Sequence, residues 1–185
     1  VDYESPNGLR DYIILSLLYT TGLRVSELIN IRVKDLSLHT PYTLLVHGKG
    51  QKSRYVPLMK SIIPSIQKYL TQKEYDRQEK LDEWLFKNHM DNQFTRQGIN
   101  YLVSKYAKRA REINPEIIPK DFSPHKMRHS AAMELVDSGI DLIYIRDLLG
   151  HVSVKTTEVY AKADARRKRE AIEAASREIV PPEEA

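Results

Sequence analysis

The chain has no cysteine among its 185 residues. Disulfide bonds and metal sites built from thiolates are therefore excluded. No apolar run reaches the ~18 residues that a membrane-spanning helix needs, and residues 1–6 do not have the composition of a signal peptide. The sequence thus predicts a chain without disulfide bonds, without a thiolate metal centre and without a membrane-spanning helix.

Neither sign of charge dominates, and positive charge is only slightly in excess, with 29 Lys and Arg against 25 Asp and Glu. The resulting net charge of +4 is compatible with a nucleic-acid partner but does not identify one. A chain of this length can bury a core and forms one domain, or one domain with a small appendage. It lacks a starting Met, so we expect it to be a domain of a longer protein.

The first third of the chain combines two helices with a small sheet. Residues 9–21 are apolar nearly all round, which is typical of a buried helix, and Gly22 stands where a helix C-cap is expected. A short second helix is predicted over residues 25–31. Two strand-like runs, at residues 42–47 and 53–58, are joined by a cation-rich turn at 48–52. A third strand is expected near residues 35–38.

The rest of the chain is predicted to be helical. Thr95 and the pair Ser123–Pro124 are helix start signals, and Asp141 caps a later helix. Helices are expected over residues 61–70, 97–113, 124–138, 141–150, after Ser153 and from 164 to 181, with a solvated helix or linker over 71–80. The second of these has an expected core face formed by Tyr101, Leu102, Tyr106 and Ala110. The fold class is therefore α+β, mainly α, with one small antiparallel three-stranded sheet.

Four clusters of polar residues are spaced along this pattern. They are Arg24 in TGLRVSEL (21–28), Lys49 in HGKGQKSRYVPL (47–58), His125 and Arg128 in SPHKMRHSAAMEL (123–135), and His151 and Tyr160 in LLGHVSVKTTEVYA (148–161). His125 and Arg128 lie three positions apart on a predicted helix and therefore share a face. The spacing allows the four clusters to converge.

This set of side chains suits the cleavage of a phosphodiester by covalent attack. Cations neutralise the charge that gathers on the non-bridging oxygens, and arginine matches phosphate bidentately. A tyrosine can be the nucleophile when a base or a cationic field helps it lose its proton. A lysine can protonate the leaving oxygen when neighbouring cations make it more acidic.

In these four motifs and their order, the chain resembles the catalytic domain of the tyrosine recombinases, the phage-integrase and Xer class. The matching segments extend from Thr21 to Ala161. The resemblance implies a helical recombinase catalytic domain over residues 1–164, followed by a tail helix over 165–185 that can pack on a neighbouring protomer. It also implies an N-terminal core-binding domain, which is absent from this chain.

The resemblance assigns the chemistry of the phosphate to five residues. Arg24 and Arg128 clamp the scissile phosphate, and Lys49 protonates the leaving 5′-hydroxyl. Tyr160 attacks phosphorus to give a 3′-phosphotyrosine, with His125 as its acid/base partner. Because the covalent link stores the energy of the broken bond, rejoining needs no metal and no other cofactor.

The remaining assignments concern support and DNA contact. By the same resemblance, His151 hydrogen-bonds a phosphate oxygen and Glu27 supports the site. Contacts to DNA are expected from Lys52, Arg54, Lys126 and Lys155. The basic run at residues 166–169 either touches the DNA backbone or is the solvated face of the tail helix.

Taken singly, several of these residues also have a structural explanation. Arg24 could pair with Glu27 as an ion pair on a helix surface, and Lys49 and Lys52 could be solvated hairpin charges. His129 is expected to be a structural histidine with a hydrogen-bonded ring. Only the joint occurrence of the four clusters favours a catalytic site.

The expected function is site-specific DNA recombination, by an integrase or transposase of a mobile element or by an Xer-type resolvase. The expected partner is double-stranded DNA with a specific recombination site, bound by a tetramer, while this fragment alone can be a monomer; no membrane is involved. The expected location is the cytoplasm, on the nucleoid. Two alternatives remain: a type IB topoisomerase, which shares the chemistry, and a non-catalytic DNA-binding regulator.

Overall fold

The structure is a computed structural model that describes residues 1, 5–48, 52–75, 77–116 and 118–150. It divides into two compact units, residues 1–131 and residues 132–185, and helix α5 (Pro124–Asp137) runs through the boundary. The second unit is described over residues 132–150. In the described ranges, no helix is long and apolar enough to cross a membrane.

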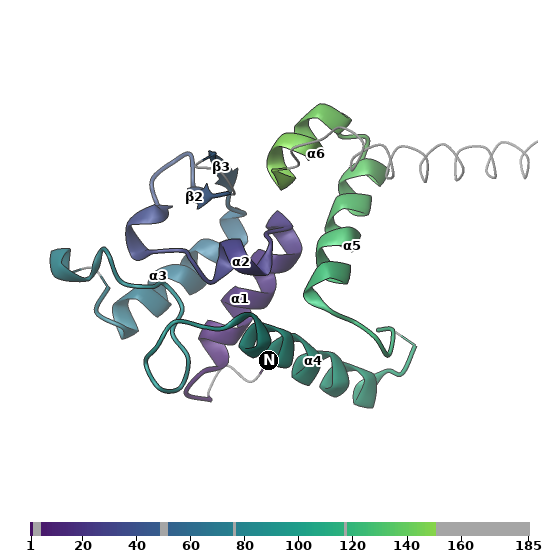
Figure 1. The fold of residues 1–185 in the computed structure, drawn as a ribbon, viewed down its shortest axis with the longest axis horizontal. Helices are drawn as coiled ribbons and strands as arrows, with labels where there is room; N and C mark the ends of the chain where they lie inside the picture. The colour runs from purple at the N-terminus through teal and green to yellow at the C-terminus, as the bar shows by residue number, and fades with distance from the viewer. Residues whose placement is uncertain (2–4, 49–51, 76, 117, 151–185) are drawn as a thin grey trace, which may run out of the picture. The chain divides into compact units, whose positions relative to one another are not determined.

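The first unit contains most of the helices and the sheet (Figure 1). Its helices are α1 (Gly8–Thr21), α2 (Val25–Leu28), α3 (Ile63–Gln72), α4 (Arg96–Ile113) and the first part of α5, with short 3-10 turns at η1 (Val33–Asp35), η3 (Lys60–Ile62) and η4 (Gln78–Lys80). The strands β1 (Leu36–Ser37), β2 (Thr43–His47) and β3 (Ser53–Pro57) form an antiparallel sheet in the order β1-β2-β3. The predicted fold class, mainly helical with a small three-stranded sheet, is confirmed.

Helix α1 is the centre of the first unit's core. Its residues Ile13, Ile14, Leu17 and Leu18 are at most 1% exposed, as its nearly continuous apolar sequence predicts. The helix ends at the predicted C-cap, where Gly22 has φ 60°, a left-handed conformation that glycine adopts without a Cβ penalty. This cap redirects the chain so that α2 begins three residues later.

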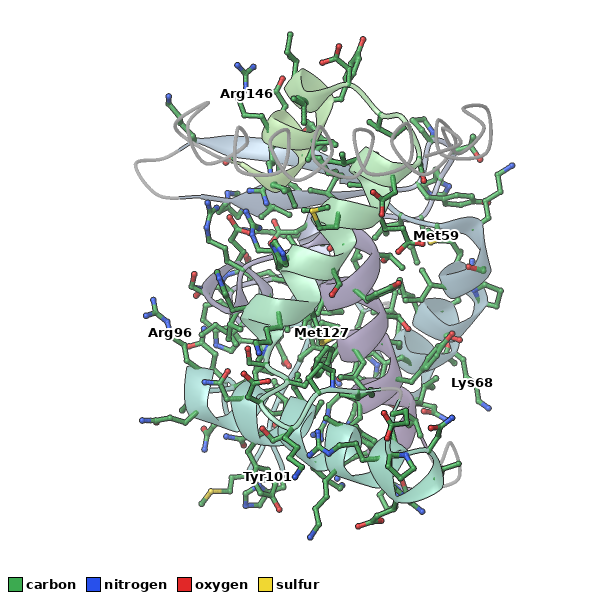
Figure 2. The ribbon with its side chains drawn as sticks, turned by 90° about the vertical axis from the view of Figure 1, so that its right-hand side faces the viewer. Met59, Lys68, Arg96, Tyr101, Met127 and Arg146 are labelled. Atoms are coloured by element: carbon green, nitrogen blue, oxygen red, sulfur yellow. The ribbon has the colours of Figure 1, made fainter. Side chains whose placement is uncertain are left out.

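Helix α4 confirms one prediction and corrects another. The Thr95 hydroxyl accepts the N–H of Gly98 at 3.0 Å, so Thr95 caps the helix as expected. Tyr101, however, is 72% exposed, and its predicted place on the core face is wrong (Figure 2). The buried residues are Ile99, Leu102, Val103 and Ala107. Tyr101 follows Ile99 by two positions, about 200° around the helix, and therefore lies on the opposite face.

The predicted linker after residue 70 contributes to the core. Helix α3 continues to Gln72, most side chains that follow are exposed as expected, but Tyr75 is buried. The Tyr69 hydroxyl donates to the Leu85 carbonyl at 3.0 Å, and the rings of Tyr69 and Phe86 lie 5.9 Å apart. The segment between α3 and α4 carries no recognisable motif, yet it covers the apolar face of α3.

The second unit joins the end of α5 to α6 (Leu142–Leu149). Gly139, at φ 76°, and the Asp141 cap, which accepts the Ile143 N–H at 2.7 Å, confirm the predicted stop and restart. Ala132, Val136, Ile145 and Leu149 form its apolar core. The helices predicted after Ser153 and from residue 164 lie outside the described residues.

Candidate active site

Arg24 occupies the N-cap of α2, two residues after the C-cap Gly22 of α1. Arginine has no side-chain acceptor and cannot cap a helix in the way that serine or aspartate does. Instead, the backbone N–H of Arg24 donates to Glu27 Oε2 at 2.9 Å, and its guanidinium donates to Glu27 Oε1 at 2.9 Å. One carboxylate therefore holds both the backbone and the side chain of Arg24.

Glu27 is a buried carboxylate between two arginines. Arg54 of β3 donates to Glu27 Oε1 and Oε2, both at 3.0 Å, in addition to the bonds from Arg24. Burial by itself raises the pKa of Glu27, but the hydrogen bonds from Arg54 and the Arg24 backbone, with the charges of both guanidinium groups, outweigh it. The pKa of Glu27 is consequently lowered, and the group is ionised at neutral pH.

Arg128 is also buried, with 7% of its surface exposed. It lies on α5, and its guanidinium donates to the backbone carbonyl of Gly22, two residues before Arg24. Arg128 thus binds the backbone of the turn between α1 and α2, close in sequence to Arg24, although more than a hundred positions separate the two arginines. Both arginines for which the sequence predicts contact with a phosphate lie in the first unit of the structure.

His125 is the second residue of the same helix, one turn before Arg128, and is exposed. The Ser123 hydroxyl accepts the N–H of Lys126 at 3.4 Å, so the predicted start of the helix is confirmed. Lys126 forms an ion pair with Asp121, and this pair lowers the pKa of Asp121. The helix thus presents a histidine to solvent and holds its buried arginine against Gly22.

The β2–β3 hairpin lies in the same unit. The Gly48 N–H donates to the Lys52 carbonyl at 2.9 Å and closes the turn, and Lys52 is exposed. His47, the last residue of β2, contacts Ser53 Oγ at 2.9 Å and Asp35 Oδ1 at 3.2 Å. The predicted residues Lys49, His151, Lys155 and Tyr160 lie outside the described residues.

Two contacts of this site are not predicted by the sequence. The sequence predicts DNA contact for Arg54 but not its bidentate bond to Glu27, and it predicts no role for His47. A signal for Arg54 was present, because side chains on a strand alternate and Arg54 lies two positions from Val56, which is fully buried. The pairing of His47 with Asp35 had no such signal, since it depends on how β1 and β2 meet.

Comparison with known proteins places these observations in a family. The phage integrase family matches residues 1–167, and the chain belongs to this family. Tyrosine recombinase XerC of Staphylococcus epidermidis is 38% identical over 160 residues, covering 86% of this chain and 51% of the relative. Tyrosine recombinase XerA of Pyrococcus horikoshii is 35% identical over 172 residues, covering 91% of this chain and 56% of the relative.

Solved structures show the same fold. A structure of the XerH site-specific recombinase bound to palindromic difH, a post-cleavage complex, matches with a TM-score of 0.77 and 27% identity over 93% of this chain and 47% of that one. A crystal structure of XerA recombinase matches with a TM-score of 0.73 and 28% identity over 90% of this chain and 58% of that one. The chain spans about half the length of the curated relatives it matches.

Proposed function

We propose that the chain is the catalytic domain of a site-specific DNA recombinase that cuts and rejoins DNA through a 3′-phosphotyrosine. The observation that carries the proposal is that Arg128 binds the carbonyl of Gly22, two residues before Arg24, whose guanidinium binds the ionised Glu27. Membership of the phage integrase family and the recombinase relatives support it. Neither a type IB topoisomerase nor a non-catalytic regulator is favoured by these relatives.

In the proposed reaction, Arg24 and Arg128 neutralise the two non-bridging oxygens of the scissile phosphate as charge builds there. The Tyr160 oxygen attacks phosphorus, and its proton passes to His125. The bond between phosphorus and the 5′-oxygen breaks, and Lys49 protonates that oxygen. His151 donates a hydrogen bond to a phosphate oxygen. Reversal of these steps with a new 5′-hydroxyl joins the exchanged strand.

The partners follow from the same proposal. The substrate is double-stranded DNA with a specific site, contacted by Lys52, Lys126 and Lys155 and bound on the nucleoid by a tetramer; XerH, a structural relative, was solved bound to its difH substrate. Residues 1–164 form the catalytic domain. The tail, residues 165–185, carries a stripe of small apolar side chains and packs on the neighbouring protomer. Loss of the tail after Asp164 is expected to alter assembly and cleavage order.

Covalent trapping tests the proposal. Duplexes bound by the full-length protein are selected from a random pool, and the recovered site is nicked to make a suicide substrate. The unchanged protein is expected to form a covalent adduct, and Tyr160→Phe is expected to form none. An equal yield of adduct with Tyr160→Phe refutes the proposal. Relaxation of supercoiled DNA that lacks the site would identify a topoisomerase. If the unchanged protein formed no adduct, the protein would be a non-catalytic DNA-binding regulator.

A further inference from the structure

Arg54 is the more enclosed of the two arginines that bind Glu27. Its side chain is 15% exposed and that of Glu27 is 4% exposed, whereas the Arg24 side chain is 42% exposed. Arg54 binds both carboxylate oxygens of Glu27 with two parallel bonds of 3.0 Å. Such a fork-to-fork pair fixes direction as well as distance, because both planes must align.

The position of Arg54 in the sheet gives this pair a mechanical consequence. Arg54 pairs with Val46 across the β2–β3 ladder and follows Lys52, which closes the turn, by two residues. Lys49 belongs to that turn by sequence. The carboxylate of Glu27 that accepts the two bonds from Arg54 also accepts the backbone N–H of Arg24, the N-cap of α2. Glu27 therefore joins the hairpin of the proposed general acid to the helix of the proposed phosphate clamp.

We propose that Arg54 is a positioning residue which, through Glu27, holds the β2–β3 hairpin against α2, and that protonation of the leaving 5′-oxygen by Lys49 depends on this hold. This inference rests on the proposed function. It replaces direct DNA contact as the main role of Arg54. A phosphate would have to displace a buried carboxylate that accepts four hydrogen bonds, and a buried charge left without its partner is costly.

Replacing the bridging oxygen of the leaving group by sulfur tests the inference, because a sulfur leaving group does not need the proton that Lys49 would supply. In an ordinary phosphodiester, the departing 5′-oxygen needs a proton, and misplacement of an acid by about 1 Å can cost roughly 100-fold in rate. When sulfur replaces that bridging oxygen, the bond between phosphorus and sulfur breaks and a thiolate leaves without a proton, because thiols are acidic near pH ~8.5. A defect that acts through Lys49 therefore disappears with the sulfur substrate.

The variants are Arg54→Gln, which loses the bidentate pair, and Arg54→Lys, which keeps the charge but not the fork. The control is Arg77→Gln, which removes an exposed arginine whose partner, Glu74, is three residues away at 2.8 Å. Adduct formation by the full-length protein is timed on the selected site with oxygen and with sulfur at the bridging position. Affinity for the same duplex is measured against salt concentration.

We expect Arg54→Gln to form adduct about 10- to 100-fold more slowly on the oxygen substrate, and within about threefold of the unchanged protein on the sulfur substrate. Arg54→Lys is expected to be intermediate on oxygen, and Arg77→Gln unchanged on both. The slope of log affinity against log salt is expected to stay the same, because no phosphate contact is lost. If Arg54→Gln is too unstable to assay, Arg54→Lys carries the same comparison.

Three results overturn the inference. These are an Arg54 variant as fast as the control, a defect of equal size on both substrates, and a salt slope that falls by about one, the mark of a lost phosphate contact. The proposed function fails separately: an unchanged protein that forms no adduct on either substrate refutes both proposals. An active unchanged protein with an equally active Arg54→Gln refutes the positioning role alone.

Discussion

Replacement of Glu27 by glutamine tests how much the buried carboxylate stabilises the first unit. Glu27 accepts four hydrogen bonds of 2.9 to 3.0 Å, two from Arg24 and two from Arg54. Glutamine keeps one acceptor oxygen and turns the other side into a donor, which then faces N–H donors. Loss of a hydrogen bond to a charged group costs about 1.5–3 kcal/mol.

The exposure of the partners sets the magnitude. Two bonds are lost, but Arg24 is 42% exposed and regains water, so its share is discounted. Arg54 is 15% exposed and stays largely enclosed. We therefore expect Glu27→Gln to lower the free energy of unfolding by about 2–4 kcal/mol at neutral pH, somewhat less than the roughly 3–5 kcal/mol that breaking a fully buried ion pair costs. Urea unfolding followed by the fluorescence of Trp84, the single tryptophan, measures it.

The pH dependence gives the prediction its sign. The pKa of Glu27 is lowered from its ordinary value of 4.5, so the unfolded chain binds the proton more readily than the folded one. The stabilisation is full above about pH 4.5 and is lost as the pH falls through the folded pKa. The difference between the unchanged protein and Glu27→Gln is therefore expected to shrink below about pH 4.5.

The matched control is Glu74→Gln. Glu74 also contacts two cations, Arg77 at 2.8 Å and Lys80 at 3.6 Å, but its side chain is 56% exposed. Exposed pairs of this kind contribute about 0–1 kcal/mol. If Glu27→Gln costs no more than Glu74→Gln, or if its cost is the same at pH 3 as at pH 7, the reasoning from burial is refuted.

Two further perturbations address other parts of the fold. Tyr106→Phe removes the hydroxyl that donates to Asp11 at 3.0 Å and is expected to cost about 1 kcal/mol at pH 7. Burial and Asp11 raise the pKa of Tyr106 to about 12, so this difference should fade as the pH rises from 10 to 12 in urea titrations; a constant difference contradicts it. Ile145→Ala, at a fully buried position, is expected to destabilise the second unit by about 2–5 kcal/mol and to speed amide exchange in α6. Ile143→Ala, at a 59% exposed position of the same helix, should leave exchange nearly unchanged, and equal effects would refute the assigned core.

Helix starts and ends were predicted well, because each depends on a few neighbouring residues. The glycine cap after α1, the threonine cap of α4 and the proline start of α5 each depend on a few neighbouring residues, and all are confirmed. The wrong prediction for Tyr101 also came from a local pattern. An aromatic residue near a helical stripe was assigned to the core, whereas the helical phase places it opposite Ile99.

The candidate site shows a sharper division. By itself, the order of the four motifs determined the family, because each motif is a short run with its own spacing. The same motifs supply the residues proposed for the reaction. What only the tertiary structure decided is how those residues are held. Arg128 meets Gly22, and Arg54 meets Glu27, across separations that no local pattern encodes. These contacts form because buried charged groups must find partners, and only the folded chain brings the partners within reach.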